Sequence, residues 1–278
     1  MMGRVEMRMY KRRQKRAKML RRLLLGLLAT TAVILLWRKL PGGFVAEHIA
    51  SPTATPLTAA FDKTIESREV TLMAETWYAI QTGVFSTEEA AVQKADEYTE
   101  RGAPGTVVHQ GEKWRVFIAC YGTEAEAASV RTRLEQNQRV ETYLYAWECP
   151  ELRLRLTGMV GQLDAAEAGF TLLTSTAAAL RDHATTLDAG QMSAQEVHAA
   201  LSAMDGQITL WEDTVHSRFG RETPALLEGM LAMTEDWDAR YEALRNAESA
   251  TALSAELKAQ GMGMYDEICT WRRNLAAK

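Results

Sequence analysis

Four side chains on two expected strands combine aromatic rings with strong hydrogen-bonding groups, and they are Trp77, Gln81, Arg115 and Phe117. Side chains alternate across a β-strand, so Trp77 and Gln81 share one face of the first strand. The same alternation places Arg115 and Phe117 together on the second strand. Aromatic rings cover the apolar faces of sugar rings, while amide and guanidinium groups bond hydroxyl and acetamido groups. The spacing therefore predicts an exposed face that binds a carbohydrate.

A final expected strand adds three more rings at alternating positions, Tyr143, Tyr145 and Trp147. These rings either extend the aromatic face or pack against the C-terminal part of the chain. Both interpretations stay open for Tyr143 and Tyr145, whereas the place of Trp147 near Pro150, at a domain boundary, favours packing. The candidate carbohydrate-binding residues are Trp77, Gln81, Arg115, Phe117, Tyr143 and Tyr145.

An internal repeat supplies the elements that position these side chains. The order of residue types that begins at Trp77 recurs from Trp114, and each copy reads as a strand followed by a helix. The helix starts are expected at Ser86 and Thr123, because each hydroxyl is followed three residues later by a glutamate, as in a capping box.

Two more strands complete this unit, at residues 104–110 and 140–148, and a turn at Gly111 separates the first of them from the Trp114 strand. The order βαββαβ predicts an α+β fold, in which a four-stranded antiparallel sheet carries both helices on one face. The more apolar strand side chains should lie beneath the helices, and the opposite face should stay open. That apolar set comprises Tyr78, Ile80, Val116 and Ile118.

The two strand sequences resemble a known family. Residues 78–86 read Tyr-Ala-Ile-Gln-Thr-Gly-Val-Phe-Ser, and residues 114–121 read Trp-Arg-Val-Phe-Ile-Ala-Cys-Tyr. In order and spacing they resemble the SPOR domain of bacterial cell-wall proteins, and the resemblance extends over residues 76–149. Two departures from the pattern are the Ala119-Cys120 pair, where Gly and Pro are usual, and Val84, where a small polar residue is common.

The resemblance implies non-catalytic binding of peptidoglycan. It further implies a preference for glycan strands that lack stem peptides, such as those at a division septum or around a forespore.

The N-terminal region predicts a membrane anchor. Residues 1–22 contain ten Lys or Arg and a single acid, and the run from 23 to 37 carries no charge. That run is shorter than the roughly 20 residues of a usual span, but basic side chains at both ends can extend into the headgroups. Arg38 and Lys39 follow at once and no small-residue cleavage site comes soon after, so a retained anchor is favoured over a cleaved signal peptide.

The positive charge fixes the expected orientation. Basic segments stay in the cytoplasm, so we expect a cytoplasmic segment at 1–22, a transmembrane helix at 23–40, and a linker at 41–75. The remainder, 76–278, should then be extracytoplasmic, which makes this a single-pass protein of the cell membrane.

Charge also excludes one class of partner. Residues 1–39 hold twelve basic and one acidic residue, so with totals of 32 and 36 the remainder holds 20 basic and 35 acidic residues. An acidic outer part argues against nucleic-acid binding, because phosphate contacts need Lys and Arg. The basic segment is expected to contact anionic membrane lipid instead.

The C-terminal region, residues 150–278, predicts an antiparallel bundle of three or four helices. Apolar residues recur there at spacings of three and four, and the expected breaks at Gly190, Gly220 and Ala247 are short. Such a bundle is expected to bind a protein partner or to self-associate.

The stretch before the bundle is ambiguous. Residues 152–156 alternate strictly between Leu and Arg, which indicates a strand, yet Leu152 and Leu156 also fit a helical repeat. We favour a strand, paired with residues 70–72.

No pattern indicates catalysis, a metal site or a cofactor. The five histidines show no zinc-peptidase spacing, and no Gly-rich phosphate loop or nucleophile elbow is present. Three cysteines do not form a disulfide framework; a bridge between Cys149 and Cys269 is conceivable, but free thiols are favoured. The parity of its strand places Cys120 in the core.

Two functional hypotheses follow. The first is a membrane-anchored protein that binds peptidoglycan without catalysis. The alternative is a membrane-anchored scaffold whose sheet face and bundle bind proteins; it predicts that Gln81 and Arg115 are buried under the helical domain.

Overall fold

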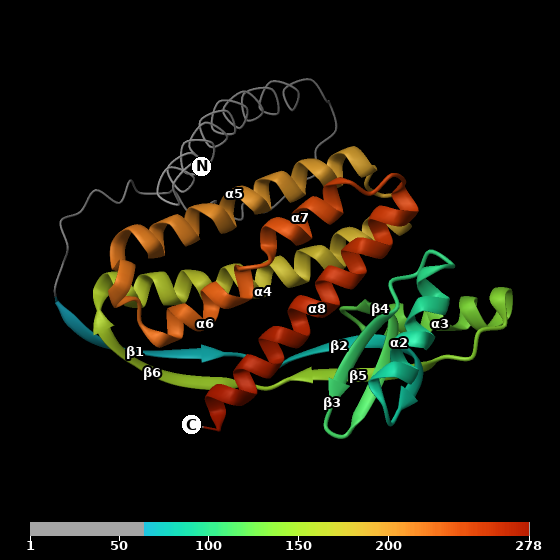
Figure 1. Cartoon of the computed structure of the whole chain (residues 1–278), viewed down its shortest axis with the longest axis horizontal. Coiled ribbons are helices and arrows are strands. Elements are labelled where there is room, and N and C mark those ends of the chain that lie inside the picture. The colour runs from blue at the N-terminus through green and yellow to red at the C-terminus, as the bar shows by residue number, and fades with distance from the viewer. Residues whose placement is uncertain (1–63, 278) are drawn as a thin grey trace, which may run out of the picture. The chain divides into compact units, whose positions relative to one another are not determined.

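The computed structural model describes residues 64–277 (Figure 1). The strands are β1 (Ile65–Leu72), β2 (Glu75–Phe85), β3 (Thr106–Gln110), β4 (Lys113–Tyr121), β5 (Tyr143–Cys149) and β6 (Leu152–Met159). The helices are α2 (Glu88–Thr99), α3 (Glu124–Gln138), α4 (Val160–Asp188), α5 (Ala194–Phe219), α6 (Ala225–Thr234), α7 (Trp237–Arg245) and α8 (Ala250–Ala276), with a 3-10 turn at Gly220–Glu222.

The expected cytoplasmic and transmembrane segments, 1–22 and 23–40, lie outside the described residues, as does most of the expected linker. None of the helices within residues 64–277 combines the length and the apolar composition that a bilayer crossing needs. The described residues belong to one compact unit, Ala59–Lys278.

The repeat folds as the βαββαβ order predicts. The strands lie in the order β3-β4-β2-β5 with every neighbouring pair antiparallel, and α2 and α3 pack on one face. Ile80 and Ile118 are buried against α3 and the end of α2, and Val116 is buried against the alanines of α2. The expected assignment of the apolar set to the helix-covered face is therefore confirmed.

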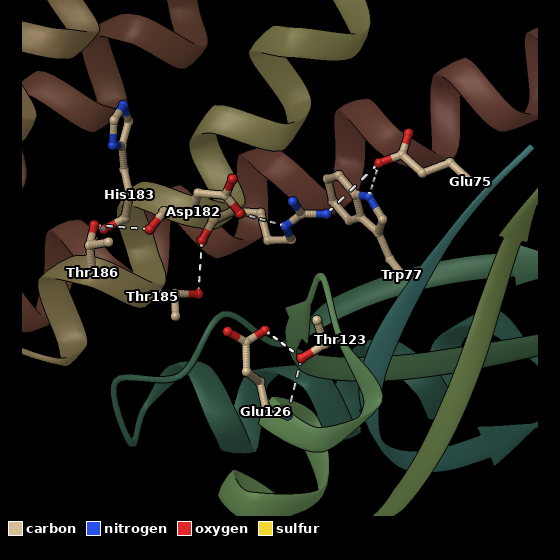
Figure 2. Close-up of polar contacts among 9 residues, drawn as sticks. Glu75, Trp77, Thr123, Glu126, Asp182, His183, Thr185 and Thr186 are labelled. Carbon is tan, nitrogen blue, oxygen red and sulfur yellow. Dashed lines mark hydrogen bonds and ion pairs between the residues drawn. The ribbon is translucent and has the colours of Figure 1, made fainter. Parts of the chain in front are cut away.

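One of the two helix starts is as expected, and the other differs by one residue. Thr123 caps α3, and its hydroxyl accepts a hydrogen bond from the backbone N–H of Glu126 at 3.3 Å, with both side chains in contact (Figure 2). In the first copy Thr87 is the cap, and it accepts from the N–H of Ala90. The prediction of Ser86 as the cap was wrong because either neighbouring hydroxyl can take this position, and the sequence does not say which.

Two irregularities in the ladder between β2 and β4 change which side chains share a face. Ile80 pairs with Ala119 and Gln81 pairs with Phe117, so Ile118 is an extra residue in β4. An extra residue turns all later side chains to the other face. Cys120 therefore lies on the face opposite α2 and α3, in the core shared with the bundle, so its predicted burial is confirmed.

A second extra residue in this ladder is Thr82 in β2. Beyond it, Val84 pairs with Arg115. This pairing places Val84 among the candidate binding residues, where strict alternation along β2 does not place it.

The strand interpretation of residues 152–156 is confirmed, and β6 forms a separate two-stranded sheet with β1. β6 pairs with β1, with Leu72 opposite Leu152, and the next pair of the ladder is Glu75 with Cys149. Two residues separate β1 from β2, and two residues separate β5 from β6. The β1–β6 pairing therefore follows the same register as the β2–β5 pairing. Residues 65–72, within the expected linker range, thus form a strand that joins the sheet to the bundle.

The C-terminal helices pack as an antiparallel bundle (Figure 1). The expected third helix is divided into α6 and α7 near Glu235. Gly261 lets α8 approach α4 closely, since an added Cβ there would lie 3.3 Å from the Cβ of Leu180. The α8 helix continues past the bundle and crosses the sheet (Figure 1), where it contacts β3, β4 and β5.

Candidate functional site

The helix α8 covers part of the sheet face that was expected to stay open. Trp77 and Trp147 are each 1% exposed and Phe117 is fully buried, all in one core with α8. The expectation of an open face was wrong for this region, because α8 presents a second apolar side to the sheet. We call it the covered region; it comprises Trp77, Ala79, Phe117, Cys120 and Trp147.

Ring contacts fill the covered region. Tyr265 of α8 stacks on Trp77 with 3.9 Å between ring centroids and 5° between planes, and it meets Trp147 edge-on at 5.3 Å. Phe117 packs against Trp147 at 5.1 Å. Trp77 and Phe117, two of the predicted sugar-binding rings, therefore serve as core, and the packing expected for Trp147 is confirmed.

Trp77 also has polar partners (Figure 2). Its indole N–H donates to Glu75 at 2.6 Å, and Arg181 of α4 lies over the ring at 4.6 Å while its Nη1 is 3.8 Å from the Glu75 carboxylate. With Tyr265 and Arg181 both over the ring, a sugar cannot stack on Trp77.

Two side chains of α8 bond the sheet backbone, and sequence reasoning identified neither. The Tyr265 hydroxyl lies 2.9 Å from the carbonyl oxygen of Glu75 and 3.0 Å from that of Trp147, so its proton serves one of them at a time. Arg272 donates to the carbonyl oxygens of Met73 at 2.9 Å and Pro150 at 3.4 Å. Met73 and Pro150 lie in the two-residue gap between the paired segments, outside both ladders. The sequence signals Tyr265 and Arg272 only through their spacing, which places residues 265, 269 and 272 on one helix face.

The remaining candidate residues lie at the far end of the face and stay accessible. Tyr143 is 54% exposed and Val84 is 44% exposed, while Arg115 and Tyr145 are half-buried. We call this region the open strip; it comprises Val84, Arg115, Tyr143 and Tyr145.

Hydrogen bonds hold the polar groups of the open strip in place. Arg115 Nη1 donates to the amide oxygen of Gln81 at 2.7 Å, and its guanidinium lies over the Tyr145 ring at 4.6 Å. The Tyr145 hydroxyl in turn donates to Gln110 at 2.6 Å. Within residues 64–277, Arg115 Nε has no hydrogen-bond partner. The strip therefore presents a fixed cation above an aromatic ring.

Tyr143 stands at the outer side of the strip. Its hydroxyl donates to Glu141 at 2.5 Å, and this bond raises the pKa of the phenol above its ordinary value. The ring is held by this bond and stays neutral at physiological pH, so it offers an apolar surface with a polar edge.

Gln81 has a supporting position. It is only 8% exposed, and its amide oxygen is occupied by Arg115. It orients the guanidinium, whereas Arg115 itself stays half-buried. The burial that the scaffold hypothesis predicts for both residues holds for Gln81 alone.

Elsewhere in the described part of the chain, no group of three or more His, Cys, Asp or Glu side chains is placed to hold a metal ion. A groove of about 340 Å³ lies between α8 and the pair α6 and α7. Its lining includes Met233, Arg240, Asp266 and Trp271. Arg240 forms an ion pair with Glu267 at its wall.

Comparison with protein-family models matches residues 74–145 to the SPOR domain. Neither the curated proteins nor the solved structures gave a match. The matched range contains β2 to β4 and the start of β5, with both covering helices, so it coincides with the βαββαβ unit. Residues 74–145 of this chain therefore match the SPOR domain, the peptidoglycan-binding family that the strand sequences resemble.

Proposed function

We propose that the protein binds peptidoglycan through the open strip, and that the covered region is a structural support with no direct contact to the glycan. The observation that carries this proposal is the division of the face: α8 occupies one end, while Arg115, Tyr143 and Tyr145 remain accessible at the other. In the proposed complex the exposed ring of Tyr143 packs on a sugar face. The guanidinium of Arg115 then bonds a hydroxyl or acetamido oxygen.

The side chains of the open strip are already ordered by their neighbours, which favours binding by a small number of contacts. Arg115 is oriented by Gln81 and by the Tyr145 ring, and Tyr145 is fixed by Gln110. A binding surface that is already ordered loses little side-chain entropy when the ligand arrives. One charged hydrogen bond is worth about 1.5–3 kcal/mol, which is at least a tenfold change in affinity.

The preferred ligand in this proposal is a glycan strand without stem peptides. Residues 40–278 carry 35 acidic and 20 basic residues, so the domain repels the carboxylates of stem peptides. The wall formed by α8 beside the strip also leaves less room for branches. Residues 1–22 and 23–40 would hold this domain at the outer side of the membrane, where it would act on new wall material in division or sporulation.

Sedimentation with purified sacculi tests the proposal. The fragment 59–278 is suitable, because it is one compact unit with its own hydrophobic cores. We expect it to pellet with sacculi, and to pellet more after an amidase has removed the stem peptides.

The matched variants are Arg115→Ala and Arg153→Ala. Both remove one positive charge, but Arg153 lies on β6, and its side chain is 78% exposed. We expect Arg115→Ala to reduce pelleting about tenfold or more, and Arg153→Ala to leave it unchanged. Absence of pelleting, or equal loss in both variants, would reject the proposal.

The scaffold alternative has one observation in its favour, the groove between α6, α7 and α8. An apolar and charged concavity of this size suits a side chain of a protein partner. A photo-crosslinker at Asn274, on the groove wall, should then give a defined adduct in host cells, and one at Arg153 should not. Adducts at neither position, or at both, would leave the bundle without a partner at this groove.

A further inference from the structure

Two of the three cysteines meet where α8 crosses the sheet. Cys149 is the last residue of β5, and Cys269 lies on α8. Both are buried in the same core, and their proximity lowers the pKa of Cys149 and raises that of Cys269. All three cysteines of the chain are free thiols in this structure.

Independent contacts on both sides fix this meeting point. On α8, Tyr265 is one turn before Cys269, and Arg272 is one turn after it, so the three share a helix face. Tyr265 bonds the carbonyl oxygen of Trp147, and Arg272 bonds that of Pro150. Trp147 and Pro150 flank Cys149 in the chain, so Cys149 and Cys269 both lie between these two anchoring contacts.

We propose that Cys149 and Cys269 form a disulfide bond when the chain folds in an oxidising compartment, and that this bond fixes α8 across the covered region. The assignment of that compartment rests on the proposed function, which places residues 41–278 outside the cytoplasm. The third cysteine, Cys120, lies in the same core but forms no such pair.

The chemistry balances with a disulfide oxidant, either a protein disulfide or oxidised glutathione. The Cys149 thiolate attacks one sulfur of the oxidant and expels the other as a thiolate. Cys269 then loses its proton, attacks the Cys149 sulfur and releases the second thiolate. The two thiols together lose two protons and two electrons, and the oxidant is reduced to two thiols.

In the docked fold the neighbouring Cys269 thiol lowers the pKa of Cys149 below its ordinary value. Burial raises the pKa of Cys120 to about 12, so that thiol stays protonated. Because Cys149 and Cys269 are buried in the folded chain, exchange takes place before α8 completes its docking.

The consequence concerns the glycan site. A bond between β5 and α8 closes a long loop, and disulfides of this kind stabilise by restricting the unfolded chain. The position of α8, which forms the inner limit of the open strip, would become permanent. The open strip itself contains neither cysteine, so glycan binding should not depend on the bond.

The test uses the full chain, reduced and unfolded, then refolded in detergent with glutathione buffers from reducing to oxidising. Acid quenching, alkylation and mass spectrometry count the free thiols. We expect three alkylated cysteines under reducing conditions and one, Cys120, under oxidising conditions. The oxidised form should melt higher by on the order of 5–10 °C.

Variants separate the pair from the third thiol. Cys120→Ser should keep the oxidation-dependent shift, while Cys149→Ser and Cys269→Ser should lose it. Three free thiols in the most oxidising buffer, or glutathione adducts on separate cysteines, would overturn the inference. Sacculus binding measured on the reduced and oxidised forms reports the proposed function separately, because failure of one result does not entail failure of the other.

Discussion

The contact between Tyr265 and the sheet should make the SPOR domain and the bundle unfold together. Tyr265→Phe keeps the ring stacked on Trp77 but removes the hydroxyl that bonds the carbonyl oxygens of Glu75 and Trp147. Loss of a buried hydrogen bond costs about 1–2 kcal/mol, because one carbonyl is left without a donor. For a unit of this size that corresponds to a fall of about 3–6 °C in Tm.

Tyr265→Ala removes the stacked ring as well. Loss of a large buried aromatic side chain costs about 3–5 kcal/mol, and Trp77 would become accessible to water. We expect tryptophan fluorescence and far-ultraviolet circular dichroism to report a single unfolding transition in both variants, each shifted as stated. The shared ribbon and the α8 anchors connect the two cores, so neither should unfold alone.

Tyr143→Phe is the matched control for the hydroxyl. This phenol is exposed, and its removal should change the unfolding free energy by less than about 0.5 kcal/mol. If Tyr265→Phe were no less stable than Tyr143→Phe, the hydrogen bond of the Tyr265 hydroxyl would contribute nothing to the free energy of unfolding. If Tyr265→Ala left the bundle transition in place while the sheet unfolded earlier, the two parts would be independent, and the reasoning would be refuted.

Three further predictions concern packing, protonation and capping. Gly261→Val should lower the free energy of unfolding in urea by about 1–3 kcal/mol, because the added side chain meets α4. Gly263→Ala should raise it by about 0.5–1 kcal/mol, because the nearest neighbour of the added Cβ is 3.6 Å away. Burial raises the pKa of Asp266 from 3.8 to about 6, so the folded chain holds this proton more tightly. The contribution of Asp266 to the free energy of unfolding is therefore largest below about pH 4 and is lost as the pH rises through about 6, by about 1–2 kcal/mol after solvent screening. Comparing the pH dependence with that of Asp266→Asn isolates this contribution, and parallel curves would contradict it. Thr87→Ala should cost about 1 kcal/mol through the lost cap of α2, whereas Ser86→Ala should be nearly neutral; a reversed order would restore Ser86 as the cap.

Strand alternation predicted the part of the site that depends on local geometry. It placed Gln81 and Arg115 on one face, where they form a hydrogen bond of 2.7 Å. It failed beyond Ile118, because an extra residue in a strand reverses the facing of everything after it and has no reliable sequence signal. Cys120 is buried as expected, but in the core shared with the bundle and not beneath α2 and α3.

The covering of the face by α8 was not predictable from the residues of the sheet. An aromatic side chain such as Trp77 suits a sugar platform and a buried core equally well, and its own strand does not distinguish them. The residues that decide the matter, Tyr265 and Arg272, are far away in the sequence. Both residues lie outside the row of apolar residues that predicted α8, and that row faces the bundle.

The position of residues 152–156 shows what alternation can establish. Their Leu and Arg residues indicated a strand, and pairing with residues 70–72 was expected; both are confirmed. The pattern did not reveal that this ribbon continues the register of the sheet. Continuity depends on equal spacing at Met73 and Pro150, which only the paired structure makes visible.

The central claim is that glycan contacts the open strip while α8 keeps the covered region closed. NMR titration of residues 59–278 with stem-peptide-free glycan fragments tests it most directly. We predict shifts of the amide signals of Val84, Arg115 and Tyr143, with the indole N–H signals of Trp77 and Trp147 unmoved. Shifts of both indole signals would mean that α8 leaves the sheet and the rings bind the glycan; an unperturbed strip would contradict the assignment altogether.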